Sequence, residues 1–534
     1  MGASTRPSPR DPAWWQLPLL LLLSLSYESL FIWNGLNLTD EGWPLYAAMR
    51  LHEGGRLYAD VFWVFPPGAL LPAWLGYALD PPGVVVARWI YAAFDVALCA
   101  ALYALGRRLM TPAYAFLGAA LLAVAAPQSH IEQLLFGYRY LLFSAVALLC
   151  FSQALRARQA RWMLLAGGCA GMALLFRLTP AFAVCAGIAV GILSSTRSWR
   201  RWLRQGLHFS AGLLLVVLPA ILYFGTSVGF ETLWREVVVR PLVMTELQRL
   251  PLPALYLPES FARWQLEYAF SMLEFWLYPL LYLAYAVRLS TRWLAARRAG
   301  KPFEDVLLLA IVVWGGVYFL RSFGRADIPH LESAIPPVCL LLAHLAEPRA
   351  RTRPARSGVS TLRVGAVFCV WVLLNAVDLY ATPEVRGERP VGSLGGAVRA
   401  IPGLRAKADS AVQAIRQLSD PGDRLLDLSA SPLLHVLSGR SGVGGSDIVM
   451  PGTFLDAEEE SRFLDRISAS PPALVLVPRK AFDSRPARAA WKTAPEVFEW
   501  VRAHYVLRTE LRDFFVLARP RGETDASGST GLEP

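Results

Sequence analysis

Long apolar runs separated by short polar segments fill the chain up to about residue 380. An α-helix needs roughly 20 apolar residues to cross a bilayer, and many of the runs approach that length. They occupy residues 14–36, 84–106, 111–126, 138–155, 162–178, 180–195, 206–225, 268–289, 304–321, 331–346 and 362–380. The pattern predicts about eleven transmembrane helices, which follow a short tail at residues 1–13.

One further apolar stretch, PPGALLPAWLGYAL (66–79), is too short for a span and begins with two prolines. We therefore expect a helix that lies along the membrane interface. The first run resembles a signal peptide because Arg6 and Arg10 precede it. Its apolar character continues to Leu36 without a clear cleavage site, so we expect it to be retained as a helix.

Composition supports a membrane protein. Of the 534 residues, 55% are hydrophobic and only 17% are charged, whereas soluble domains have roughly 25% charged residues. The six cysteines all fall inside apolar runs, so no disulfide framework is expected. No metal-binding spacing of Cys or His occurs, so no cofactor is predicted and a divalent metal, though not signalled, stays open.

The net charge of +11 comes almost entirely from arginine. The arginines lie in short clusters between apolar runs, as is typical of the cytoplasmic loops of membrane proteins rather than of a surface that binds nucleic acid. With the N-terminus in the cytoplasm, every strong cluster falls on the cytoplasmic side. These clusters lie at residues 107–108, 156–161, 197–204, 288–301 and 349–356.

Three segments are then left outside: 37–83, 226–267 and everything after about 380. The expected location is the inner (plasma) membrane, with several passes and an extracytoplasmic C-terminus. Within the last segment, 381–408 is rich in Gly, Pro and Arg and is predicted to be a linker. Residues 409–518 alternate short helix and strand signals, which predicts a small soluble α/β domain. The tail 519–534 is predicted to be disordered.

An acidic pair, Asp40 and Glu41, stands directly after the first apolar run. Thr39 before it is a good N-cap, so the pair could simply begin a helix, where acids interact favourably with the helix dipole. The functional alternative is a general base with a neighbouring carboxylate that organises the site. We select Asp40 as the base and expect Glu41 to pair with a cation and set the loop.

A second cluster, RSFGRADIPHLESAIPPV (321–338), lies between two apolar runs on the same outer side. Arg325, Asp327 and His330 are its candidate binding residues, because Arg offers a fork of donors to phosphate and His can add another. The structural alternative is a solvated turn whose arginines contact lipid headgroups.

If the acidic pair and the second cluster share a cavity on the outer side, four further residues are candidates for lining it: Tyr58, Asp60, Tyr138 and Arg139. The first two belong to the aromatic segment RLYADVFWVFPPG (56–68). Such a segment also suits the aromatic belt at a membrane interface, and that purely structural interpretation stays open.

Together these motifs resemble GT-C-fold glycosyltransferases, in particular the bacterial relatives of protein O-mannosyltransferases and of the lipid A aminoarabinose transferase. A soluble domain after the last span is a further similarity. Phe65 departs from the pattern, since many relatives have a polar residue before the double proline. The resemblance is carried by Asp40-Glu41, Gly54-Gly55, Tyr58-Ala59-Asp60-Val61-Phe62, Pro66-Pro67, Ala87-Arg88, the turn from Gly324 to His330, and Pro336-Pro337.

The resemblance implies an enzyme that uses a polyprenyl-phosphate-linked sugar as donor. The sugar would pass, with inversion, to a hydroxyl of an extracytoplasmic glycan, lipid or protein. Arg325, Asp327 and His330 would then bind the donor phosphate, and Asp40 would take the proton of the acceptor. Two other classes remain open: a flippase or transporter of lipid-linked sugars, and a membrane receptor without catalytic activity.

Overall fold

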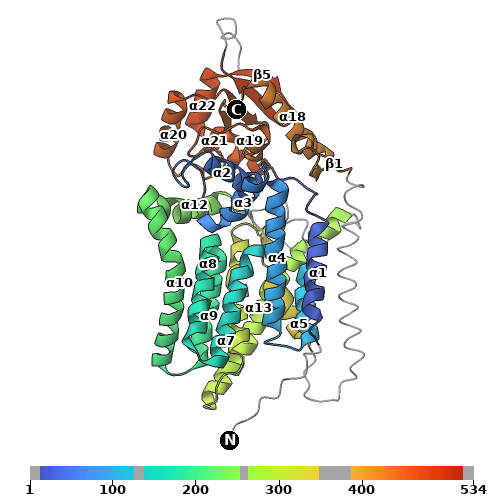
Figure 1. Ribbon diagram of the computed structural model, residues 1–534, viewed down its shortest axis with the longest axis vertical. Coiled ribbons are helices and arrows are strands. Elements are labelled where there is room, and N and C mark those ends of the chain that lie inside the picture. The colour runs from blue at the N-terminus through green and yellow to red at the C-terminus, as the bar shows by residue number, and fades with distance from the viewer. Residues whose placement is uncertain (1–12, 125–137, 253–262, 348–386, 521–534) are drawn as a thin grey trace.

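The computed structural model describes residues 13–124, 138–252, 263–347 and 387–520. Figure 1 shows a bundle of roughly parallel helices with a C-terminal domain covering one end. The bundle helices are α1 (Gln16–Ser29), α4 (Val84–Gly106), α5 (Pro112–Ala123), α7 (Leu142–Ala157), α8 (Ala160–Phe176), α9 (Leu178–Ser195), α10 (Trp199–Val228), α13 (Arg263–Arg298), α14 (Val306–Phe319) and α16 (Ile335–Ala346).

Each predicted span that falls within the described residues coincides with a helix. Within the described ranges, five helical segments are long and apolar enough to cross a membrane: Val84–Gly106, Arg139–Ala157, Leu178–Ser195, Trp199–Val228 and Val306–Phe323. Three shorter apolar helices, α5, α8 and α16, accompany them. The predicted span 362–380 and most of both predicted tails lie outside the described residues. The chain is therefore a multi-pass helical membrane protein.

The first helix is shorter than predicted, because α1 ends at Ser29 although the apolar run continues to Leu36. The cause is Arg88, which donates hydrogen bonds to the backbone carbonyls of Ile32 (2.8 Å), Asn34 (3.1 Å) and Gly35 (3.0 Å). A buried guanidinium thus binds carbonyls that would otherwise accept bonds within a helix. The hydrophobicity of the sequence alone cannot reveal that α1 ends at Ser29.

Glycines bring α8 and α10 into close contact. A Cβ atom on Gly167 would lie 1.9 Å from the backbone oxygen of Phe209, and one on Gly212 would lie 2.0 Å from that of Leu164. Small residues allow this backbone approach, which drives helix association where lipid supplies no hydrophobic force.

The segments between the bundle and the C-terminal domain are also helical. They comprise α2 (Gly42–His52), η1 (Pro67–Leu70), α3 (Leu71–Leu79), α11 (Phe230–Trp234), the π-helical turn η3 (Arg235–Val239), α12 (Arg240–Leu247), η4 (Leu320–Phe323) and α15 (Ile328–Glu332). The stretch 66–79, predicted as a short helix, forms η1 and α3.

The C-terminal domain contains a four-stranded sheet of order β3-β4-β6-β5. The strands β3 (Leu425–Asp427) and β4 (Leu474–Pro478) run parallel, with Leu425 opposite Leu474. The strands β5 (Val506–Glu510) and β6 (Phe514–Ala518) complete it with antiparallel pairings. The helices of the domain are α18 (Pro402–Leu418), α19 (Leu433–Ser438), α20 (Ala457–Ala469), α21 (Ala490–Thr493) and α22 (Pro495–His504).

The prediction of a linker at 381–408 is wrong for residues 387–408, the part of the segment that the structure describes. Strands β1 (Arg389–Pro390) and β2 (Arg399–Ala400) pair there, and α18 begins at Pro402. Strands of two residues carry no periodic signal, and Pro402 at the first helical turn looks like a breaker although it suits that position. The folded domain therefore begins well before residue 409.

One hydrophobic core joins the first outer segment to the C-terminal domain. It contains Trp43 and Leu45 from α2, Leu433 from α19 and Val412 from α18. The approach is closest at Gly42, where a Cβ atom would lie 2.3 Å from the backbone nitrogen of Leu433. The C-terminal domain is thus packed onto the first outer segment over a continuous interface.

The loop after α13 and the C-terminal domain lie at opposite ends of the bundle in Figure 1. The arginine cluster 288–301 adjoins that loop, so we expect it on the cytoplasmic side. A reporter inserted after Lys301 should report the cytoplasm, and one fused after Arg519 should report the extracytoplasmic side. Identical results at both positions would contradict this arrangement of spans.

Candidate active site

The acidic pair lies in a tight turn ahead of α2. The side-chain oxygen of Asn37 accepts hydrogen bonds from the backbone N–H groups of Thr39 (3.0 Å) and Asp40 (2.8 Å). The Asn37 amide also donates to the Asp40 carboxylate at 3.2 Å. Thr39 does not cap the helix as predicted, because its hydroxyl donates to the backbone oxygen of Ala430 at 2.6 Å. The turn is therefore fixed by Asn37 and by the C-terminal domain.

The two carboxylates have different environments. Glu41 is fully buried and forms a two-pronged pair with Arg88, in which Nε–Oε1 is 2.6 Å and Nη2–Oε2 is 2.8 Å. The same guanidinium binds the three carbonyls that follow α1, so Glu41 and Arg88 hold the turn against the bundle. Glu41, the member of the candidate catalytic pair that was expected to bind a cation and set the loop, is on this geometry a positioning residue.

Asp40 is only partly buried and its neighbours are charged. Removal from water raises the pKa of the Asp40 carboxyl to about 6. The positive charge of Arg325 opposes this rise, whereas the negative charges of Asp327 and Asp483 add to it. The first outer segment and the turn at 321–338, predicted to share one side of the membrane, therefore come within electrostatic reach of each other.

Arg325 is held between two carboxylates. Its Nε donates to Asp327 at 2.7 Å, and its Nη2 donates to Asp483 of the C-terminal domain at 3.1 Å. Among the described residues the structure shows no bond from Nη1. Asp483 also pairs with Arg488, which in turn donates to the backbone oxygen of Arg249 at 2.9 Å. The fork of Arg325 is thus oriented while donors remain for an anion.

One ring nitrogen of His330 is engaged by the neighbouring Asp327. Its Nδ1 lies 2.5 Å from the Asp327 carboxylate. Burial lowers the pKa of His330, and hydrogen bonding to His330 and Arg325 holds the pKa of Asp327 at about 2 despite burial. Since the ionised carboxylate only accepts, the single proton of the neutral imidazole sits on Nδ1. In this arrangement His330 holds Asp327 and Asp327 orients Arg325, and their contact with a donor phosphate stays a prediction.

Two more arginines, Arg321 and Arg177, belong to this charged region, and the charge of Arg321 reaches His330. The guanidinium of Arg177, in the break between α8 and α9, stands 3.9 Å from the centroid of the Phe65 ring and 5.2 Å from that of Tyr140. The charge of Arg321 reaches Arg177, and Arg321 donates to the hydroxyl of Tyr318 at 2.5 Å. The aromatic ring of Phe65, which departs from the polar pattern of the resembled family, thus supports a cation.

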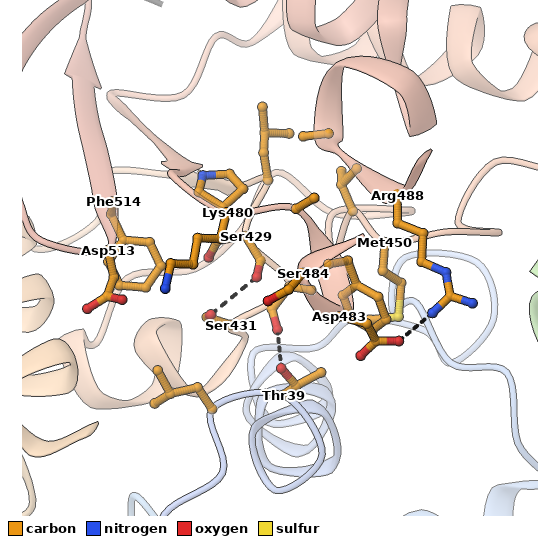
Figure 2. A pocket seen from close by; sticks show the side chains of 18 of the residues that line it. Thr39, Ser429, Ser431, Met450, Lys480, Asp483, Ser484, Arg488, Asp513 and Phe514 are labelled. Carbon is orange, nitrogen blue, oxygen red and sulfur yellow. Dashed lines mark hydrogen bonds and ion pairs between the residues drawn. The ribbon is translucent and has the colours of Figure 1, made fainter. Parts of the chain in front are cut away.

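A cavity of about 390 Å³ lies between the first outer segment and the C-terminal domain. Thr39 and Asn37 of the first outer segment line it together with Asp483 and Arg488 of the C-terminal domain. Figure 2 shows Asp483 and Arg488 on one side of the cavity, Lys480 and Asp513 on the other, and Thr39 below them. Asp40 and Arg325 do not themselves line the cavity, but Thr39, which precedes Asp40, and Asp483, which binds Arg325, do.

The other predicted lining residues take different positions. Tyr58 is buried and donates to the backbone oxygen of Phe65 at 2.8 Å, and Asp60 pairs with Arg56 at 2.8 Å on the surface. Arg139 is buried at the outer end of its helix and pairs with Asp95 at 3.3 Å. None of the three lines this cavity. The side chain of Tyr138 lies outside the described part of the chain.

Sequence reasoning missed Asn37 and Asp483. Asn37 carries a usable signal, since Asn shortly before a helix start often bonds the following N–H groups. Asp483 stands in a polar segment of the C-terminal domain, 158 residues after Arg325, and nothing local marks it. Only the tertiary fold brings Asp483 and Arg325 together.

Comparisons with known proteins agree with this arrangement. A family described as dolichyl-phosphate-mannose-protein mannosyltransferase matches residues 65–224. The fold is similar to that of ArnT from Cupriavidus metallidurans bound to undecaprenyl phosphate, with a TM-score of 0.56 and 16% identity over 95% of this chain and 98% of that one. It is also similar to the oligosaccharyltransferase AglB from Archaeoglobus fulgidus, with a TM-score of 0.51 and 12% identity over 97% of this chain and 75% of that one. A comparison with curated proteins finds no match.

The family match and the shared fold define the class. The chain has the fold of these GT-C glycosyltransferases, with several membrane-spanning helices and a small C-terminal sheet domain, and its residues 65–224 match one of their families.

Proposed function

We propose that this enzyme transfers a sugar from a polyprenyl-phosphate donor to a hydroxyl group on the outer side of the plasma membrane. Support for the donor comes from the matched family, whose name specifies dolichyl-phosphate-mannose, and from the ArnT structure, which holds undecaprenyl phosphate. The acceptor is a glycan, a lipid or a protein.

The proposal is supported by the placement of Asp40, held by Asn37, within electrostatic reach of Arg325, which Asp327 and Asp483 orient. A carboxylate whose pKa lies near 6 is mostly ionised at neutral pH and still basic enough to accept a proton in a transition state. An oriented guanidinium stands within its electrostatic reach. A base and an anion-stabilising cation are the two groups that a displacement at a sugar phosphate requires.

In the reaction, the acceptor oxygen forms a bond to the anomeric carbon while the bond from that carbon to the phosphate oxygen breaks. Asp40 takes the proton of the acceptor hydroxyl, and the leaving polyprenyl phosphate keeps the electron pair. The phosphate gains negative charge in this step, so cations that favour the product-like charge lower the barrier. We assign that role to Arg325, with Arg321 and Arg177 adding positive charge nearby. A single displacement of this kind inverts the anomeric centre.

The test uses purified protein in proteoliposomes with radiolabelled polyprenyl-phosphate mannose and an envelope extract as a source of acceptors. Release of polyprenyl phosphate measures transfer. Arg325→Ala should lower kcat/KM for the donor by about 10²–10³-fold, because a preorganised donor to the developing charge is lost. Arg325→Lys should recover only part of the lost kcat/KM, because the lysine ammonium is a point charge and lacks the two-pronged donor geometry of the guanidinium.

The matched control is Arg462→Ala, which removes an arginine from an exposed pair on α20. It should behave like the unmodified protein. Equal activities of Arg325→Ala and Arg462→Ala would remove Arg325 from the site. Movement of intact donor across the bilayer without cleavage would instead indicate a flippase, and binding without cleavage or movement would indicate a receptor.

A further inference from the structure

The cavity beside Asp40 extends into the C-terminal domain. Its walls include the segments that follow β3 and β4, among them Ser429, Ser431 and Lys480. These two strands are the parallel pair of the sheet. In α/β domains, ligands bind in the crevice at the carboxyl ends of parallel strands, where the connections diverge. The position is therefore one that suits a binding site, independently of the catalytic residues.

Two lysines stand at the end of the cavity away from Asp483. Lys407 extends from α18, and Lys480 follows β4. The chain has only four lysines, Lys301, Lys407, Lys480 and Lys492, so two of the four line one cavity. Such a concentration at the wall of a concave site favours a negatively charged ligand.

These lysines are not used to hold the fold together. Among the described residues neither ammonium group makes a hydrogen bond or an ion pair. Lys407 lies over the ring of Phe514, with its Nζ 4.8 Å from the ring centroid, and is within electrostatic reach of Asp513, Asp427 and Lys480. Since both ammonium groups line the cavity without such a bond, each can form a charge-assisted hydrogen bond to an anion there.

We propose that the cavity binds the acceptor through a carboxylate or phosphate group held by Lys407 and Lys480, which directs a hydroxyl of the same molecule past Thr39 toward Asp40. The inference deepens the proposed transferase function and rests on it. The acceptor is then an acidic glycan or an anionic lipid headgroup. The serines of the wall and Asp513 would bind neutral hydroxyls of that ligand.

The geometry links the two ends of the site. Thr39 donates to Ala430 at the cavity wall and precedes Asp40 in the chain. Asp483 lines the cavity and also binds Arg325, so the acceptor chamber and the proposed phosphate site share a wall. A volume of about 390 Å³ falls in the usual range of small-ligand sites.

Binding can be measured without transfer. Full-length protein in neutral phosphatidylcholine nanodiscs would be titrated with mannose 6-phosphate and with mannose, and the dissociation constants would be obtained by calorimetry. We expect the phosphorylated sugar to bind at least about tenfold more tightly, because charge-assisted hydrogen bonds are about twice as strong as neutral ones. The variant Lys407→Gln/Lys480→Gln should lose that preference.

Two matched variants complete the experiment. Lys492→Gln removes the same charge from an exposed lysine of the same domain that does not line the cavity, and it should keep the preference. Lys407→Arg/Lys480→Arg keeps both charges and should retain binding, which separates charge from misfolding. Equal binding of the two sugars to the unmodified protein, or an unchanged preference in the double Gln variant, would overturn the inference.

A further arm identifies the source of the anion. If nanodiscs containing phosphatidylglycerol abolish binding of mannose 6-phosphate, the site takes a lipid headgroup. If they do not, it takes a soluble acidic glycan. Asp40→Asn should bind mannose 6-phosphate normally in either case. In the unmodified protein, anion binding without any donor cleavage would sink the transferase mechanism alone, whereas donor cleavage without anion binding would sink only the acceptor site.

Discussion

Asp40→Asn should reduce sugar transfer by about 10²–10⁴-fold while leaving the protein folded in the membrane. The asparagine keeps the shape of the side chain and its contact with Asn37, but it cannot accept a proton from the acceptor hydroxyl. The measurement is turnover of polyprenyl-phosphate mannose per amount of protein. Asp60→Asn provides the control, because Asp60 lies in the same outer segment and pairs with an exposed arginine away from the cavity.

The pH dependence gives a second readout of the same carboxylate. Its pKa is raised to about 6, and the base is the ionised form, so kcat/KM should rise with pH up to about 6 and then level off. Below pH 6 the slope should approach about tenfold per pH unit. Asp40→Asn should abolish this limb. Near-normal turnover in Asp40→Asn, or an unchanged acid limb, would mean that another group is the base.

The largest effect on stability is expected from Arg88→Met. The methionine fills a similar volume but leaves the Glu41 carboxylate buried without its partner and three backbone carbonyls without their donor. Breaking a buried ion pair by removing one partner typically costs about 3–5 kcal/mol. That is a large share of the roughly 5–15 kcal/mol that stabilises a typical folded protein. Unfolding midpoints in mixed detergent micelles would measure the loss.

Arg56→Met is the matched control, since Arg56 pairs with Asp60 on the surface, where water and salt screen the interaction. It should show little change. The double variant Glu41→Gln/Arg88→Met should recover part of the loss, because no charge is then left buried. If Arg88→Met unfolds at the same midpoint as Arg56→Met, the pair does not stabilise the turn, and Arg88 is not the reason that α1 ends early.

Much of the membrane part could be predicted from the sequence because its signal is strong and local. A run such as 84–106 is apolar enough to be a helix whatever surrounds it, and the helix found there has the same bounds. The candidate pair Asp40–Glu41 is also evident in the sequence, since two acids directly after a membrane span are unusual. The division of roles between them needed the structure, because only Arg88 determines that Glu41 is the buried partner.

The remainder depended on contacts between segments far apart in the chain. The early end of α1 follows from Arg88, and the orientation of Arg325 follows from Asp483 in another domain. The strands β1 and β2 are too short to show alternation, so their segment resembles a linker. Nothing in the residues around Lys407 indicates that Lys480 lies nearby. Tertiary partners of this kind leave no periodic trace in a sequence.

The core that joins α2 to the C-terminal domain has a consequence for biogenesis. Thr39 and its hydrogen-bond partner Ala430 are 391 residues apart in the chain. At roughly 5–20 residues per second, synthesis separates their appearance by roughly 20–80 s. During that interval the apolar side chains of α2, among them Trp43 and Leu45, emerge before the domain that will cover them. The nascent first outer segment must therefore be shielded by the membrane surface or by a chaperone on that side until the last part of the chain arrives.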